Sequence, residues 1–306
     1  MKLIKPSVEL IKPKGYELKD IYSHIELCGR TCYHSTDRIE EGTSEPFVKR
    51  MIDAKHYAML EHGTVYLFLS LAALPEYKDH LVNELFYYSI VEKYSRNPYS
   101  RVVEVDESSA YITTNYRVMV ENEWLDDLQF LCAPTENHVR RVTAKFICNR
   151  QVWNEFIRHR EIHRTDDYEI YLTDYDAEKN FSFAQESTRY CNYSKEKFGK
   201  ELTFIQPCWY DDKETTLWSK VIFESKLRSA ESGYFSLLEE GWKPQQAALV
   251  LPNDIKTELV MTGYVDDSGW KHFFDLRAKG TTGAPHPQAK ELAEPLMREF
   301  IKEKLL

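Results

Sequence analysis

The sequence predicts a mixed α/β fold that forms one domain over residues 1–306. Three observations support this prediction: stretches with helical spacing alternate with short stretches rich in β-branched and aromatic residues, no internal repeat or low-complexity linker divides the chain, and the last third is mainly helical. Because 42% of the 306 residues are apolar, the chain can bury a substantial core.

The first half of the chain contains both kinds of pattern. Leu18, Ile21 and Ile25 have the spacing of one helical face, whereas residues 64–70 contain β-branched and aromatic residues typical of a buried strand. The expected elements are an extended segment at 8–11, helices at 18–30 and 45–55, a strand at 64–70, a helix at 75–94, a strand or hairpin at 110–120 and a helix at 122–130.

The second half is predicted to be mostly helical. An apolar stripe at Val142, Phe146, Trp153 and Phe156 predicts a helix over 139–157. Residues 165–180 are acidic with few apolar side chains, and they are expected to form a hydrated excursion. The further expected helices cover 218–240, a short segment from Pro244, 255–264, 270–278 and 287–305, with a kink at Pro295 in the last.

Composition excludes several classes of protein. The net charge of −9 argues against a surface that is broadly adapted to nucleic acid. The N-terminal residues lack the apolar segment of a signal peptide, and the longest apolar run is too short to span a bilayer, so a cytoplasmic protein without membrane contact is expected. The six cysteines form no CxxC pair, which predicts reduced thiols and no metal site.

Residues 158–189 concentrate groups that can hold a planar anion. The stretch begins with Arg158-His159-Arg160 and ends with Gln185-Glu186-Ser187-Thr188-Arg189. Cations at a helix C-terminus would explain the first cluster by themselves, because they complement the helix dipole. The second cluster favours a nucleotide site, since the planar fork of arginine binds phosphate bidentately and hydroxyl groups add hydrogen bonds.

These residues resemble the signature of the flavin-dependent thymidylate synthases (ThyX), in which RHR is followed by a serine and then by Ser and Arg five and seven positions later. Ser182, Ser187 and Arg189 occupy those positions. Other segments resemble the family in the same order; they are 30–33, His56, 61–62, 251–252, 261–263, 272–277 and 286–287. The resemblance implies an antiparallel or mixed sheet with flanking helices and a helical C-terminal half, in a single catalytic domain with insertions at about 75–138 and 161–181.

The resemblance also implies an activity, the reductive methylation of dUMP to dTMP. 5,10-Methylenetetrahydrofolate would give the carbon, NADPH would reduce FAD, and the reduced flavin would supply hydride without an enzyme nucleophile. Arg277 would be the catalytic residue, because a guanidinium beside the uracil stabilises the charge that develops as N3 loses its proton.

By the same resemblance, each remaining site residue has an expected role. Cofactor-binding residues would be His56, Arg158, His159, Arg160, Gln185 and His272. Residues that bind dUMP would be Glu155, Arg158, Gln185, Glu186, Ser187, Thr188, Arg189 and Arg277. A homotetramer with active sites at subunit interfaces is expected, so one site would combine contacts from different chains.

The chain departs from the family pattern in two places that affect the site. The segment 161–181 lengthens the spacing between the two clusters, and Ala248 stands where many members have a phosphate-binding arginine. Arg150 or Arg164 would then supply that phosphate contact.

Two alternatives remain open at this point. Cys208 follows a proline, as does the nucleophile of the flavin-free thymidylate synthases. Such a cysteine must be activated by nearby positive charge, and no other part of that family's pattern is visible in this chain, so a structural or incidental role is expected. The basic segment 138–164, with tyrosine and tryptophan nearby, could instead serve a non-catalytic nucleotide-binding or RNA-binding module.

Overall fold

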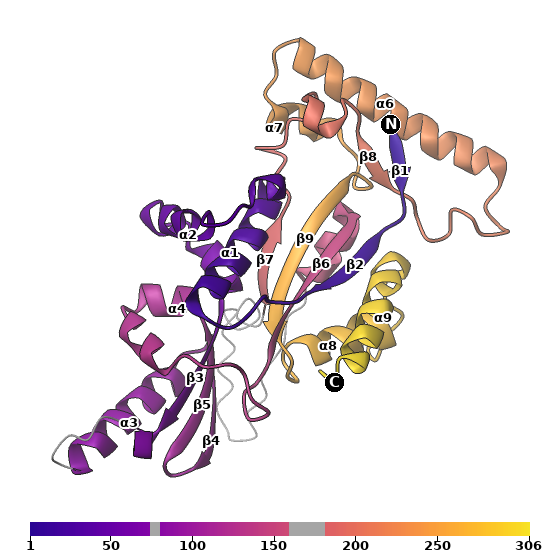
Figure 1. Ribbon diagram of the computed structural model, residues 1–306. Helices are drawn as coiled ribbons and strands as arrows, with labels where there is room; N and C mark the ends of the chain where they lie inside the picture. The colour runs from indigo at the N-terminus through magenta and orange to yellow at the C-terminus, as the bar shows by residue number, and fades with distance from the viewer. Residues whose placement is uncertain (74–79, 159–180) are drawn as a thin grey trace.

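Three β-sheets form the framework of the protein (Figure 1), whose computed structural model describes residues 1–73, 80–158 and 181–306. The central sheet is antiparallel, with the order β2 (Ser7–Ile11), β6 (Arg141–Asn149), β9 (Lys256–Tyr264), β7 (Phe181–Gln185). A second antiparallel sheet has the order β3 (Thr64–Ser70), β5 (Ser109–Asn115), β4 (Arg101–Asp106). The third is a parallel pair, β1 (Lys2–Ile4) and β8 (Thr203–Ile205).

Helices flank these sheets on several sides. The N-terminal helices are α1 (Leu18–Cys32), α2 (Ser44–Asp53), α3 (His80–Ser95) and α4 (Tyr116–Glu121). The later helices are α5 (Arg150–Phe156), α6 (Leu217–Glu239), α7 (Pro244–Ala247), α8 (Trp270–Phe274) and α9 (Pro287–Lys302). Figure 1 shows α6 with β1 and β8 at one end of the molecule and the three-stranded sheet at the other. None of the helices in the described part of the chain combines the length and apolar character needed to cross a bilayer.

Shorter helical turns connect these elements. The 3₁₀ helices are Thr36–Arg38, Tyr57–His62, Leu71–Ala73, Leu125–Phe130, Glu196–Phe198 and Ala248–Val250. A π-helix, Asp275–Lys279, continues directly from α8. Arg277 lies on this π-helix with a side chain that is 15% exposed, whereas Phe273 and Phe274 of α8 are fully buried in the core.

The two faces of the central sheet meet different partners, because side chains alternate along each strand. Phe146 and its cross-strand partner Leu259 face α8 and α9, where they join a cluster of buried aromatic residues. The opposite face carries Ala184 and Val260, which pack against Cys28 of α1. The sheet therefore separates an aromatic side from a side covered by α1.

Many predicted elements are confirmed. The extended segment at 8–11, the strand at 64–70 and the helices at 18–30, 45–55, 218–240 and 287–305 correspond to β2, β3, α1, α2, α6 and α9. Of the predicted helix at 75–94, the described part from residue 80 is α3. Residues 165–180 lie outside the described residues.

Two predicted helices are wrong where the chain forms central strands: the prediction for 255–264 fails throughout, and that for 139–157 fails over its first part and is confirmed over α5. Residues 139–157 form β6 and then α5, which begins after the N-cap Asn149. Val142 and Phe146 are four residues apart, a spacing that places side chains on one side of a strand as well as of a helix. Residues 255–264 form β9, whose consecutive buried residues Leu259 to Met261 have no period that distinguishes a buried strand from a buried helix.

The prediction for 110–130 is partly wrong. The strand β5 stops at Asn115, whose side chain accepts a hydrogen bond of 3.1 Å from the Val118 amide and so starts α4. Residues 122–130 contain a 3₁₀ helix, Leu125–Phe130, in place of an α-helix.

Candidate active site

Helix α5 and the π-helix bring the first group of predicted residues together. Asn149 caps α5 by accepting from the Val152 amide at 2.9 Å, and its side-chain amide donates to Gln288 of α9 at 3.2 Å. Phe156, at the end of α5, contacts the rings of Phe146 and Phe273. These contacts place the last turn of α5 against the π-helix that follows α8.

Glu155 lies between two arginines at this junction. Its carboxylate is 2.8 Å from Arg158 Nη2 and 3.5 Å from Arg277 Nη1, and its backbone carbonyl accepts from Arg277 Nη2 at 2.5 Å. The three residues form what we call the Glu155 cluster. The carboxylate thus restrains the orientation of Arg277 while the guanidinium keeps its charge.

Arg277 is largely buried, with a side chain that is 15% exposed. Its Nε is buried and has no hydrogen-bond partner among the described residues. Burial lowers the pKa of Arg277, an effect that Glu155 opposes and Arg158 reinforces. A guanidinium remains cationic despite such a shift, so the cluster presents a partly desolvated positive charge.

The end of β7 places Gln185 and Glu186 on opposite faces of the central sheet. Gln185 is on the aromatic side, where its amide donates to Thr257 at 3.2 Å. This is the side of α5, because Trp153 of α5 contacts Phe183 with ring centroids 5.6 Å apart. Gln185 therefore shares a face of the sheet with the Glu155 cluster.

Glu186 is only 2% exposed and belongs to a buried network of charges under α1. Lys256 Nζ lies 2.9 Å from Glu186 and 2.7 Å from Glu258, and Lys145 Nζ lies 2.8 Å from Glu258. Burial by itself raises the pKa of Glu258, but the two lysines outweigh it and lower the pKa to about 2. His34 also approaches this network, with its ring nitrogen 3.6 Å from Glu258.

The C-terminal end of α1 connects the second group of predicted residues. The Ser187 amide donates to the Cys32 carbonyl at 3.0 Å, and the Tyr33 and Tyr190 rings lie 5.0 Å apart. The same end of α1 borders a cavity of about 450 Å³, the His56 cavity, whose lining is Cys32, Tyr33, Lys55, His56, Tyr57, Ala58, Met59 and Arg117. Segment 187–190 and the His56 loop therefore meet at one place.

Arginines 117 and 189 add positive charge around this meeting point. Arg117 forms an ion pair of 2.5 Å with Glu61, which precedes β3. The Arg189 guanidinium lies over the Tyr190 ring at 5.2 Å, and this arginine is exposed. Thr188 lies between Ser187 and Arg189 and is partly exposed.

Some predicted residues stand apart from these groups. His159, Arg160 and Arg164 lie outside the described residues. Ser182 is buried and accepts from Arg141 Nη2 at 3.1 Å, which fixes it inside the sheet. His272 lies on α8, five residues before Arg277, and is partly buried. No hydrogen bond or ion pair between described residues joins the Glu155 cluster to segment 187–190.

The network around Lys256 was not foreseen from the sequence. Lys256 and Glu258 are two residues apart, a spacing that would place both on one face of a strand, but the segment was predicted to be helical. His34, Glu186 and Glu258 hold atoms of the kind that bind metals within 4.8 Å of one another. Lys145 and Lys256 already neutralise these carboxylates, so the network is explained as an internal salt bridge.

The fold is mixed α/β, and the site contains a partly buried arginine, Arg277, that a carboxylate restrains. The sequence profile of the thymidylate synthase complementing protein family (Thy1) matches residues 137–304, more than half of the chain. The chain belongs to this family, which is the ThyX family, and membership makes it a methyltransferase of the thymidylate synthase type.

Other comparisons add little to this assignment. No curated protein matches the chain in sequence. Among solved structures, the UMP/dUMP methylase PolB from Streptomyces cacaoi bound with 5-Br dUMP is 14% identical, with a TM-score of 0.43 over 99% of this chain and 93% of that chain. The same enzyme bound with 5-Br UMP is 12% identical, with a TM-score of 0.44 over 99% and 92%. Scores of this size leave the family match as the basis of the assignment.

Proposed function

We propose that the protein converts dUMP to dTMP by reductive methylation, with 5,10-methylenetetrahydrofolate as the carbon donor and NADPH-reduced FAD as the source of hydride. The observation that carries the proposal is Arg277, which family resemblance places beside the uracil and which Glu155 restrains in a partly buried position.

Arg277 would promote the reaction by electrostatic stabilisation. A guanidinium in a partly desolvated site stabilises the negative charge that develops on the pyrimidine when N3 loses its proton, and C5 then becomes nucleophilic. The restraint by Glu155 reduces the reorganisation that this interaction would otherwise require.

The phosphate of dUMP would bind near the end of β7. Arg189 is exposed there beside Ser187 and Thr188. Of Arg150 and Arg164, Arg150 is the one in the described part of the chain, at the start of α5, and we propose it in place of the family arginine at Ala248.

The His56 cavity would hold part of the flavin. The ring nitrogen of His56, the sulfur of Cys32 and the aromatic ring of Tyr33 suit a planar ring, and Arg117, which pairs with Glu61 and Glu121, lies at the edge of the cavity. When bound there, FAD would accept electrons from NADPH and deliver hydride to the transferred carbon. Arg158, which lies on the surface with a side chain 63% exposed, would reach the flavin of a neighbouring subunit in the proposed homotetramer.

The alternative function in RNA binding is less compatible with the described part of the basic segment. Arg141 is buried, Lys145 pairs with Glu258, and Arg158 pairs with Glu155. These cations are buried or paired with carboxylates of the protein, so they do not form a continuous phosphate-binding surface.

A single purification tests the proposal. The protein should show a flavin absorbance spectrum, alone or after added FAD, and dUMP with methylenetetrahydrofolate should accelerate reoxidation of the reduced flavin. Light scattering should give about four times the chain mass of 36.2 kDa. A protein that takes up no FAD, or that binds RNA tightly in a salt-dependent way and turns over no dUMP, would reject it.

A further inference from the structure

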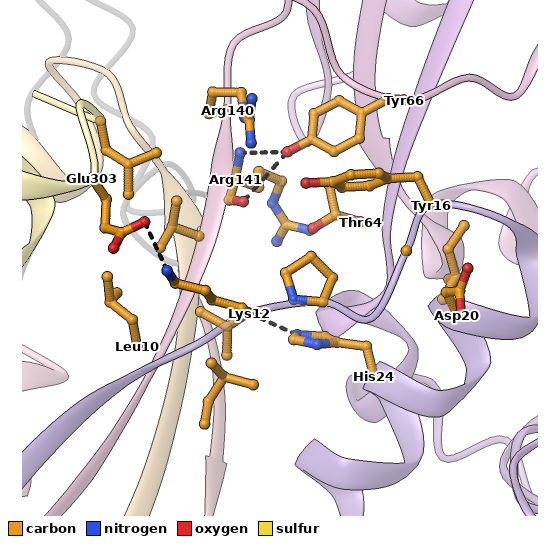
Figure 2. Close-up of a pocket in the computed structure, with 17 residues that line it drawn as sticks. Leu10, Lys12, Tyr16, Asp20, His24, Thr64, Tyr66, Arg140, Arg141 and Glu303 are labelled. Atoms are coloured by element: carbon orange, nitrogen blue, oxygen red, sulfur yellow. Dashed lines mark hydrogen bonds and ion pairs between the residues drawn. The ribbon is translucent and has the colours of Figure 1, made fainter. Parts of the chain in front are cut away.

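A second cavity lies between α1, β2 and the C-terminal residues (Figure 2). Its volume is about 300 Å³, at the lower end of the range for small-molecule sites. It shares no lining residue with the His56 cavity or the Glu155 cluster. No function described above uses it.

The walls of this cavity combine aromatic and aliphatic surfaces. The rings of Tyr16 and Tyr66 lie edge to face with centroids 5.9 Å apart, and Leu10, Val142 and Leu305 add aliphatic surface. The Tyr66 hydroxyl accepts from the Arg141 amide at 3.0 Å, so this ring is fixed in place. Such walls suit a flat, apolar ring.

Arg140 provides a cation that no carboxylate in the described part of the chain pairs with. Its Nε is buried, with no hydrogen-bond partner among the described residues. Its neighbour Arg141 also has a buried Nε without a partner among the described residues, but Arg141 Nη1 donates to the Glu61 carbonyl at 2.9 Å and Nη2 donates to Ser182. A buried donor without a partner is costly, and a ligand oxygen would remove that cost.

The charges around the cavity favour a ligand with one negative charge. The lining contains three cations, Lys12, Arg140 and Arg141, and two carboxylates, Asp20 and Glu303. Figure 2 shows the ion pair between Lys12 and Glu303, 2.7 Å long, on the side of the cavity away from Arg140 and Tyr66. Because the remaining charge is a single positive one, a monoanionic carboxylate balances it and a phosphate dianion does not.

We propose that this cavity binds a small aromatic monocarboxylate, with the carboxylate on the Arg140 guanidinium and the ring against Tyr16 and Tyr66. The site is separate from the one proposed for dUMP and flavin, and it does not depend on that function. Arginine is well suited to the role, since its fork binds both oxygens of a planar carboxylate.

Calorimetric titration of the full chain with benzoate tests the proposal. Benzoate should bind saturably, and neutral benzamide and inorganic phosphate should bind at least about tenfold more weakly, because a hydrogen bond to a charged group contributes that much or more. Arg140→Gln should weaken benzoate binding by about tenfold or more. Arg140→Lys keeps the positive charge but lacks the planar fork of arginine, so its affinity for benzoate should lie between those of the parent protein and Arg140→Gln.

Arg298→Gln is the matched control, because Arg298 is exposed on α9 and does not line the cavity. It should leave benzoate binding unchanged. Circular dichroism and thermal unfolding should show that each variant is folded. The proposal is overturned if benzoate shows no saturable binding at millimolar concentration, if benzamide or phosphate binds as well as benzoate, or if folded Arg140→Gln binds benzoate like the parent protein.

Discussion

Glu155 holds the Arg277 guanidinium through two acceptors, its carboxylate and its backbone carbonyl. Removal of Arg277 should therefore affect catalysis at this position. Arg277→Ala should lower the rate of dUMP methylation by at least about a hundredfold, because it deletes a donor that acts on developing charge. Flavin absorbance should stay unchanged, since the His56 cavity lies elsewhere. Stopped-flow flavin reoxidation measures both properties, and Arg228→Ala on the exposed surface of α6 is the control. Normal turnover in Arg277→Ala would reject the proposed role.

Cys208 should be dispensable for catalysis. Burial raises the pKa of its thiol, and the negative charge of Glu291 raises it further, so the reactive thiolate is disfavoured at neutral pH. Cys208→Ala should therefore retain at least about half of the parent kcat for dUMP methylation. Loss of turnover in a folded Cys208→Ala protein would favour a nucleophilic mechanism.

His62, which is buried, and His24, which is partly buried, should make stability depend on pH. His24, Thr143, Thr262 and His62 form a chain of hydrogen bonds of 2.8, 2.8 and 2.7 Å through the central sheet. Burial lowers the pKa of His24 to about 4 and that of His62 to about 3, from an ordinary 6.5. The unfolded chain therefore binds protons below pH 6.5 that the folded chain does not bind.

This difference in proton binding determines how the stability of the folded protein changes with pH. The stability contributed by neutral histidines is complete above pH 6.5 and is lost as the pH falls toward 4 and then 3. Urea midpoints measured between about pH 7.5 and about pH 4.5 should fall, and His24→Gln should show a smaller fall over that range. An identical pH profile for the variant and the parent would contradict this account.

At the scale of elements, one capping residue fixes the start of α5. Asn149 caps the helix and also donates to Gln288 and, at 3.3 Å, to Asp254. Asn149→Ala should therefore lower the free energy of unfolding by about 2–3 kcal/mol, more than the roughly 1 kcal/mol typical of a cap alone. Thr216→Ala at the exposed start of α6 is the comparison, with an expected loss of about 1 kcal/mol. Equal losses would show that the extra hydrogen bonds contribute nothing.

The strands β6 and β9 were both predicted as helices, and the two errors have the same cause. β6 and β9 each pair with two strands and pack on both faces, so apolar residues occupy positions of both parities. Strand alternation is then hidden, and a spacing of four residues is compatible with either structure. β3, whose residues are largely β-branched or aromatic, did not present this ambiguity, and its bounds were predicted to the residue.

At the scale of the whole molecule, Tyr264 joins the central sheet to the three-stranded sheet. Its hydroxyl lies 2.7 Å from the Tyr99 carbonyl and 3.0 Å from the Thr113 carbonyl, and Arg101 lies 4.4 Å above its ring. Tyr264→Phe should lower the free energy of unfolding by about 1–2 kcal/mol, because a buried hydroxyl and its acceptors lose their bond. Urea unfolding should keep one transition, as the single-domain prediction requires.

The control for this prediction is Tyr88→Phe, since Tyr88 is 48% exposed on α3. It should change the midpoint little. If Tyr264→Phe instead unfolds in two transitions, the two sheets belong to separate domains and the single-domain prediction is wrong.

The sequence by itself determined the fold class and the family, because these depend on residue types and their spacing, and it predicted the site residues. It also determined several helices and the strand β3, where local periodicity was unambiguous. The tertiary structure decided which residues meet: Glu155 with Arg277, Ser187 with Cys32, and Lys256 with two buried carboxylates. Those contacts join positions far apart in the chain and depend on strand pairing and on the face that each side chain occupies, neither of which local spacing specifies.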